Sequence, residues 1–109
     1  MRRVEQDNLV YYEFAMWQGI KHGLFTRIGG VSPSPWASLN MGGNVGDSIE
    51  NVRQNHELMF EALHLNANKG CTVWQVHSAD VVIANAPRPN RRWLAQADGI
   101  LTDRLDLPL

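Results

Sequence analysis

The sequence has a single cysteine, Cys71, among 109 residues, which excludes an intramolecular disulfide scaffold. No apolar run approaches the roughly 20 residues of a membrane span, and no apolar signal core follows the first seven residues. The sequence also lacks an excess of charge of either sign, because it has 10 basic and 11 acidic residues and a formal net charge of -1. These absences argue against secreted disulfide proteins, membrane proteins and nucleic-acid-binding proteins. We therefore expect a cytoplasmic protein with no nucleic-acid and no membrane partner.

The length and the hydrophobic content set the scale of the fold. With 44% hydrophobic residues, 109 residues suffice for one core, which predicts a single domain over residues 1–109. Gly, Ser and Pro predict a long irregular loop over residues 29–46, and Pro and Arg predict an exposed loop over residues 87–92. Apolar, β-branched and aromatic runs predict strands over residues 10–14, 20–26, 72–76, 81–84 and 99–102.

One amphipathic helix is predicted to begin at Asp47 or Ser48. Glu50 lies three residues after Asp47, which is the spacing of a capping box. Side chains that recur at steps of three and four then form one stripe: Ile49, Val52, His56, Met59, Phe60 and Leu63. The stripe predicts that the helix packs against a sheet, with His56 half-buried in the contact.

Two polar segments in the predicted loop are candidates for ligand binding. Arg27 stands before Gly29 and Gly30, and this pattern either presents a guanidinium and backbone N–H groups to an anion or forms a tight turn with a solvated arginine. Ser38 and Asn40 stand just before two further glycines. Their short side chains either reach a ligand or satisfy their own turn.

A third candidate is His77, at the end of the strand predicted over residues 72–76. A histidine in this place is a metal ligand, a general base or a structural residue. Asp80 either orients the imidazole of His77 or begins a turn. Cys71 is a nucleophile if a basic partner lowers its pKa, and otherwise a small buried residue.

These segments together resemble the YfiH-like laccase-domain family, also called multicopper polyphenol oxidase-like proteins. The resemblance runs from about His22 to the last residue. It implies an α+β (mixed α/β) fold of β-sheets sandwiched with helices, of which residues 1–109 are the N-terminal portion. The stretches that carry it, in order, are His22–Ser32, Ala37–Gly42, Val45–Asp47, the helix with Val52 and Asn55, Gln75–Val82 and Ala97–Thr102.

The resemblance implies purine nucleoside phosphorylase and adenosine deaminase activities at a site that binds zinc, with copper as the other metal proposed. His77 inherits the role of a metal ligand and catalytic residue. The family's other two ligands belong to Ala-Asp-Cys and His-Ala-Gly-Trp segments, which do not occur in these 109 residues, and Cys71 does not fit the ligand motif. By their places in the motifs, Arg27 is expected to contact phosphate or ribose, and Ser38 and Asn40 to hydrogen-bond the nucleoside.

Three hypotheses about function follow. In the first, the chain is part of a zinc-dependent purine nucleoside phosphorylase with adenosine deaminase activity. It is then inactive alone, because one imidazole does not hold catalytic zinc, and a missing C-terminal half or a partner chain completes the site. In the second, the chain is a truncated, non-catalytic interaction module that recruits a partner through an unfinished sheet edge. The third is a copper-dependent polyphenol oxidase, which four scattered histidines do not support.

Overall fold

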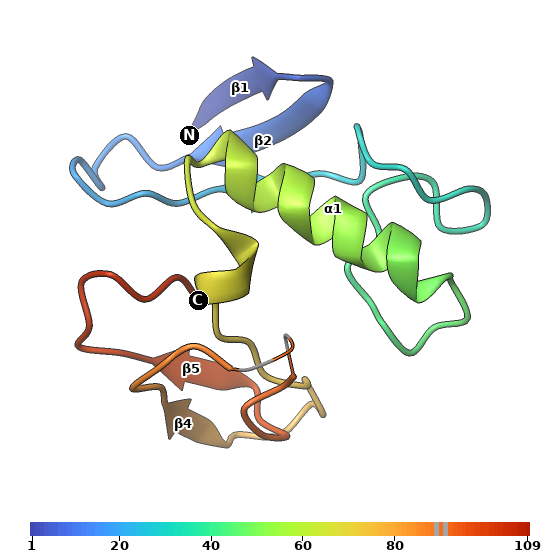
Figure 1. The fold of residues 1–109 in the computed structure, drawn as a ribbon. Coiled ribbons are helices and arrows are strands. Elements are labelled where there is room, and N and C mark those ends of the chain that lie inside the picture. Colours follow the sequence, from blue (N-terminus) through green and yellow to red (C-terminus); the bar gives the residue numbers. More distant parts are fainter. Residues whose placement is uncertain (89, 91) are drawn as a thin grey trace. The chain divides into compact units, whose positions relative to one another are not determined.

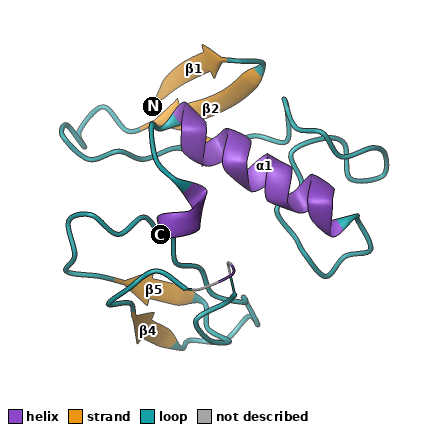
Figure 2. Cartoon of the chain, viewed as in Figure 1, coloured by secondary structure: helices purple, strands orange, loops and turns teal. Residues whose placement is uncertain are grey.

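The computed structural model describes residues 1–88, 90 and 92–109. The chain divides into two compact units, Met1–Leu65 and Asn66–Leu109. The described residues form two β-sheets, one α-helix and a short 3₁₀ helix, Ala67–Lys69 (Figures 1 and 2). The predicted α+β class is confirmed, whereas the single domain over residues 1–109 stays a prediction. Among the described residues, no helix combines the length and the apolar character that crossing a bilayer requires.

A three-stranded antiparallel sheet opens the first unit. Its strands β1 (Arg2–Gln6), β2 (Leu9–Glu13) and β3 (Leu24–Phe25) lie in the order β1-β2-β3. Asp7 and Asn8 join β1 to β2 with φ values of 51 and 69, as a two-residue hairpin with two left-handed positions requires. β2 is therefore the central strand, and its first three residues are buried.

Two strand predictions in this unit have different outcomes. The strand predicted over residues 10–14 is confirmed within one residue. The strand predicted over residues 20–26 is wrong in its first half, because only its last part pairs with β2. The reason is His22, whose Nε2 accepts the Phe14 N–H at 2.8 Å while its Nδ1 lies 2.8 Å from the Ile20 carbonyl. The histidine therefore holds residues 14–22 as a loop.

Helix α1 (Ile49–Ala62) begins after Ser48, whose hydroxyl accepts the Asn51 N–H. Of the two caps predicted, Ser48 is thus the one used. The helix packs against the sheet, as predicted, through a core that includes Leu9, Tyr11, Leu39 and Ala62 (Figure 1). Ile49, a member of the predicted stripe, is 48% exposed and was wrongly placed in it, whereas Asn55 of α1, which was not placed in the stripe, is completely buried.

The loop prediction for residues 29–46 is confirmed, since no helix or strand interrupts that stretch. The loop is fastened to α1 by side chains of the helix. His56 is half-buried, as predicted, and its Nε2 lies 3.2 Å from the Met41 carbonyl. The loop is irregular but it is held against a regular element.

The second unit contains a parallel pair of strands, β4 (Val81–Ile83) and β5 (Gly99–Leu101). Both were expected at these positions and are confirmed. The strand predicted over residues 72–76 is wrong, because only an isolated bridge between Trp74 and Gln96 forms there. The polypeptide turns away directly afterwards, around Asp98.

Cys71 is 1% exposed and packs with Ala84 and Leu107. Of the two alternatives for Cys71, the small buried residue is confirmed. In the loop predicted over residues 87–92, Pro87 and Arg92 are exposed. Arg88 is half-buried, contrary to that prediction, and Pro89 and Arg91 lie outside the described residues.

Candidate functional site

Arg27 follows β3 and opens the long loop of the first unit. Its carbonyl accepts the N–H groups of Ser38 and Leu39, both at 2.9 Å, and the Ser38 hydroxyl at 3.0 Å. Its side chain is exposed, and within the described part of the chain its guanidinium has no hydrogen bond and no ion pair. The backbone of Arg27 is thus fixed while its charged group is left for solvent or a ligand.

The Ser38 hydroxyl builds the turn that follows Arg27. It accepts the N–H groups of Gly29 at 3.1 Å and Gly30 at 3.0 Å, and it donates to the Arg27 carbonyl. These three bonds engage its one hydrogen and both lone pairs. Gly29 has φ 99, and a Cβ on Gly30 would collide with the Ser38 carbonyl, so both positions require glycine. The tight turn is therefore formed around the Ser38 hydroxyl, and anion binding by the Arg27 guanidinium beside it stays a prediction.

Asn40 also satisfies its own turn. Its Oδ1 accepts the Gly42 N–H at 3.0 Å, and its Nδ2 donates to Asp47 Oδ2 at 3.1 Å and to the Gly42 carbonyl at 3.3 Å. The structure therefore brings Arg27, Ser38 and Asn40 together in one loop. It gives Ser38 and Asn40 internal hydrogen bonds and leaves only the charge of Arg27 unpaired.

Asn55 joins this loop to α1. Its Oδ1 accepts the Val31 N–H at 2.8 Å, and its Nδ2 donates to the Ser32 hydroxyl and to the Asn40 carbonyl, both at 2.9 Å. The sequence pattern marks Asn55 only as a member of the helix motif. The missed signal is an amide inside an apolar stripe, where burial requires that every polar atom has a partner.

Asp47 closes the loop at its far end. Its carboxylate accepts hydrogen bonds from the hydroxyl of Ser32, from Nδ2 of Asn40 and from the N–H of Ser48. These bonds favour the charged form, and the one from Ser32 contributes most, so the pKa of Asp47 lies below its usual value. The loop is therefore held by an ionised carboxylate at neutral pH.

His77 lies in the second unit, on a turn that Asp98 holds. The N–H groups of Val76, His77 and Ser78 all donate to the Asp98 carboxylate. The Ser78 hydroxyl and these amides lower the pKa of Asp98, the hydroxyl most of all. The imidazole of His77 is exposed, and neither ring nitrogen has a hydrogen bond to any residue that the structure describes.

Asp80 does not orient the imidazole. Its backbone is part of the turn: the Asp80 N–H donates to the Ser78 hydroxyl at 3.2 Å, and the Asp80 carbonyl accepts the Asp98 N–H at 2.9 Å. The turn alternative for Asp80 is therefore the one found. No local pattern in the sequence points to Asp98 as a partner of His77, although Asp98 lies within the Ala97–Thr102 stretch of the family resemblance.

His77 is one potential metal ligand rather than a complete metal site. Over residues 1–88, 90 and 92–109, no three His, Cys, Asp or Glu side chains come together in a way that could hold a metal. An exposed imidazole whose two nitrogens make no hydrogen bond can serve as one ligand of a zinc or copper ion. Cys71 does not, because burial raises the pKa of its thiol and keeps it in the neutral form.

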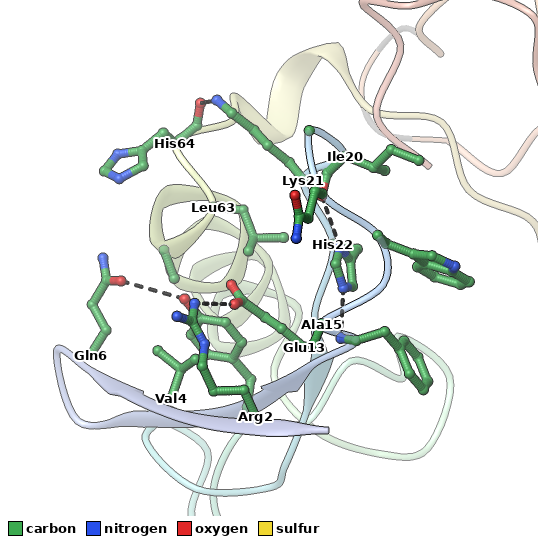
Figure 3. A pocket seen from close by; sticks show the side chains of 16 residues that line it. Arg2, Val4, Gln6, Glu13, Ala15, Ile20, Lys21, His22, Leu63 and His64 are labelled. Atoms are coloured by element: carbon green, nitrogen blue, oxygen red, sulfur yellow. Dashed lines mark hydrogen bonds and ion pairs between the residues drawn. The ribbon is translucent and has the colours of Figure 1, made fainter.

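A cleft of about 850 Å³ lies elsewhere in the first unit (Figure 3). It is lined by β1, by the loop that His22 holds and by the end of α1, where Lys21 Nζ donates to the His64 carbonyl at 3.2 Å. Arg2 and Glu13 form an ion pair across its wall. None of Arg27, Ser38 and Asn40 lines it, so the predicted ligand-binding residues and this cleft are separate features of the unit.

Residues 21–109 match the sequence model of a family described as multi-copper polyphenol oxidoreductase laccase. The purine nucleoside phosphorylase ORF3 of Streptomyces griseus is 36% identical over 104 residues, which cover 93% of this chain and 42% of that protein. The purine nucleoside phosphorylase YfiH of Escherichia coli is 34% identical over 89 residues, which cover 79% of this chain and 35% of that protein.

Solved structures show the same relationship. The crystal structure of YlmD from Geobacillus stearothermophilus superimposes with a TM-score of 0.80 at 28% identity, covering 95% of this chain and 41% of that chain. The structure of YfiH from Bacillus licheniformis gives a TM-score of 0.77 at 25% identity. The chain thus spans about two fifths of the length of the proteins it matches.

Proposed function

Because the chain belongs to the multi-copper polyphenol oxidoreductase laccase family, the family its sequence resembles, we propose that it is the N-terminal part of a purine nucleoside phosphorylase. Relatives that match most of this chain carry that name. In the proposed reaction, an oxygen of inorganic phosphate bonds to the ribose C1′ atom. The bond from C1′ to the purine nitrogen breaks, and the products are the free base and ribose 1-phosphate.

One observation supports the proposal most strongly. The Ser38 hydroxyl and the backbone groups of the turn hydrogen-bond to one another, whereas the Arg27 guanidinium is left unpaired. Phosphate is a multiply charged anion with several acceptor oxygens. A guanidinium offers a planar fork of donors that matches two of them. We assign phosphate binding to Arg27, where a fixed backbone places the charge before the substrate arrives.

Ser38 and Asn40 take a supporting role in this proposal. Both are expected from the sequence to contact the nucleoside, but their side-chain groups are engaged within the loop. We assign them to the shape of the loop, through which they fix the backbone of Arg27. Direct contact with a nucleoside would require either side chain to exchange an internal hydrogen bond for one to the substrate.

His77 would hold a zinc ion, with copper as the alternative, as one ligand among several. When bound, such a metal would supply Lewis-acid chemistry. The chain itself presents the imidazole to solvent, on a turn in which the amides of Val76, His77 and Ser78 bind Asp98. The remaining ligands would come from polypeptide beyond these residues or from a partner chain. We therefore propose that the 109 residues alone are inactive.

Adenosine deaminase activity and a cytoplasmic location belong to the same proposal. Deamination removes the exocyclic amine at the purine C6 atom, so it is measured independently of phosphate. The family description also names polyphenol oxidation. A protein that oxidises phenols would need a redox-active metal, and it would have no use for inorganic phosphate.

A chimera tests the proposal. The 109 residues replace the matched segment of the Streptomyces griseus relative, and the chimera is assayed for phosphate-dependent release of base from inosine and adenosine. We expect phosphorolysis and bound zinc. Phenol oxidation with copper, or a folded chimera that has neither activity nor metal, would overturn the proposal in favour of an oxidase or an interaction module.

In the chimera, Arg27→Ala is expected to raise the KM for phosphate by about 10- to 100-fold, because about 1.5–3 kcal/mol of charged hydrogen bonding is lost. The KM for the nucleoside should change far less. Arg104→Ala is the matched control, since Arg104 is also exposed. An unchanged KM for phosphate in Arg27→Ala would remove Arg27 from the site.

A further inference from the structure

Three consecutive amides of the second unit enclose the carboxylate of Asp98. Oδ1 accepts the N–H of Val76 at 3.2 Å and that of His77 at 2.7 Å, and Oδ2 accepts the N–H of Ser78 at 2.5 Å. The Ser78 hydroxyl also donates to Oδ2. Successive amides that converge in this way form a nest for an anion. Here a side chain of the same polypeptide fills the nest.

His77 has a backbone conformation that residues with a Cβ avoid. Its φ is 58, in the left-handed region, where the Cβ crowds the following carbonyl. Such a conformation persists only where the surroundings impose it, and it is found preferentially at functional positions. The His77 amide is the central one of the three that Asp98 binds, so the carboxylate is the group that imposes it.

Asp98 is itself held in place at the sheet. Its N–H donates to the Asp80 carbonyl at 2.9 Å, and the Gly99 N–H donates to the same carbonyl at 3.2 Å. Asp80 and Asp98 directly precede β4 and β5, which pair in parallel from their first residues. The carboxylate is therefore attached where two hydrogen-bonded strands begin, and the turn that carries His77 is built on that base.

We propose that Asp98 is the positioning residue of His77. Its carboxylate fills the nest, holds residue 77 in the left-handed conformation and thereby turns the imidazole outward with both ring nitrogens unengaged. The inference rests on the proposed function in one respect, because an imidazole held outward serves a metal only if the metal site exists. A buried structural histidine would need neither the unfavourable backbone nor the carboxylate.

A double-mutant cycle separates this role from ordinary stabilisation. Glycine adopts the left-handed conformation without a Cβ penalty, so His77→Gly should make Asp98 less necessary. We expect Asp98→Asn to lower the melting temperature by at least about 4 °C. In the His77→Gly background, the same substitution should lower it by less than half as much. Asp106→Asn, a change at an exposed aspartate of the same unit, should have no effect in either background.

The φ-dependent coupling between the amide and α protons of residue 77, measured by NMR, provides a second readout. Asp98→Asn should shift this coupling away from its left-handed value, whereas Asp106→Asn should not. If Asp98→Asn prevents folding in both backgrounds, Ser78→Ala, which removes only the hydroxyl contact to Asp98, takes its place in the cycle.

Equal losses in both backgrounds, with an unchanged coupling at residue 77, would overturn the positioning role. That result would leave phosphate-dependent activity of the chimera untouched. Conversely, an inactive chimera with a positive cycle would overturn the proposed function and leave the positioning of His77 intact.

Discussion

Replacement of Asn55 by alanine is expected to loosen the loop that presents Arg27. The Asn55 side chain is 0% exposed and makes three hydrogen bonds, to the Val31 N–H, the Ser32 hydroxyl and the Asn40 carbonyl. Each such bond contributes about 0.5–1.5 kcal/mol, and the orphaned backbone groups add a penalty. The higher helix propensity of alanine recovers only about 0.5 kcal/mol. We expect a net loss of about 3 kcal/mol.

For a unit of this size, about 3 kcal/mol corresponds to a fall of about 12–24 °C in the melting temperature. The measurement is thermal and urea unfolding of Asn55→Ala beside Gln54→Ala, its exposed neighbour on α1. The control should stay within about 0.5 kcal/mol of the parent. Amide exchange at Val31 should also become faster in Asn55→Ala alone.

A loss below about 1 kcal/mol in Asn55→Ala, or one equal to that of the control, would refute this reasoning. It would mean that water replaces the amide without cost and that α1 does not hold the loop. The assignment of phosphate binding to a rigidly presented Arg27 would then lose its structural support.

Elements that depend on neighbouring residues were predictable from the sequence. Ser48 marks the start of α1 because a hydroxyl satisfies an amide only three residues away. β4 and β5 are short apolar runs bounded by polar residues, and each was found within one residue of its predicted place. The long loop was visible from its glycines and prolines.

β1 shows what such local patterns miss. Three of its five residues, Arg2, Arg3 and Glu5, are charged, so neither an apolar run nor clear alternation marks it as a strand. Its pairing with β2 comes from the turn at Asp7 and Asn8, residue types that tolerate the left-handed conformation. A turn between two weak strands is a signal only when both strands are considered together.

The residues of the candidate site, too, could be predicted from the sequence only in part. Arg27 and His77 stood out by residue type, because a guanidinium and an imidazole have recognisable chemistry. The groups that hold the site did not: Asn55 binds Val31 across 24 positions, and Asp98 binds His77 across 21. Such pairings depend on how loops close in space, and no periodicity of the sequence encodes that closure.

Two further predictions concern groups that stabilise the interior of each unit, Asp47 in the first and Cys71 in the second. Asp47 has a lowered pKa because Ser32 and its other donors favour the carboxylate, so it stabilises the fold above the pKa of an unfolded aspartate, about 3.9. This stabilisation is lost as the pH falls through the folded value. The urea midpoint should therefore drop more steeply below about pH 4 in the parent than in Asp47→Asn, and parallel curves would contradict the role of the carboxylate. Cys71 is 1% exposed, and burial raises the pKa of its thiol, so a thiol reagent at pH 8 should label the folded chain far more slowly than the chain in urea. Labelling of the folded chain at the rate of an unhindered thiol would show that the core around Ala84 and Leu107 opens readily, and that the second unit does not hold the turn of His77 on a stable base.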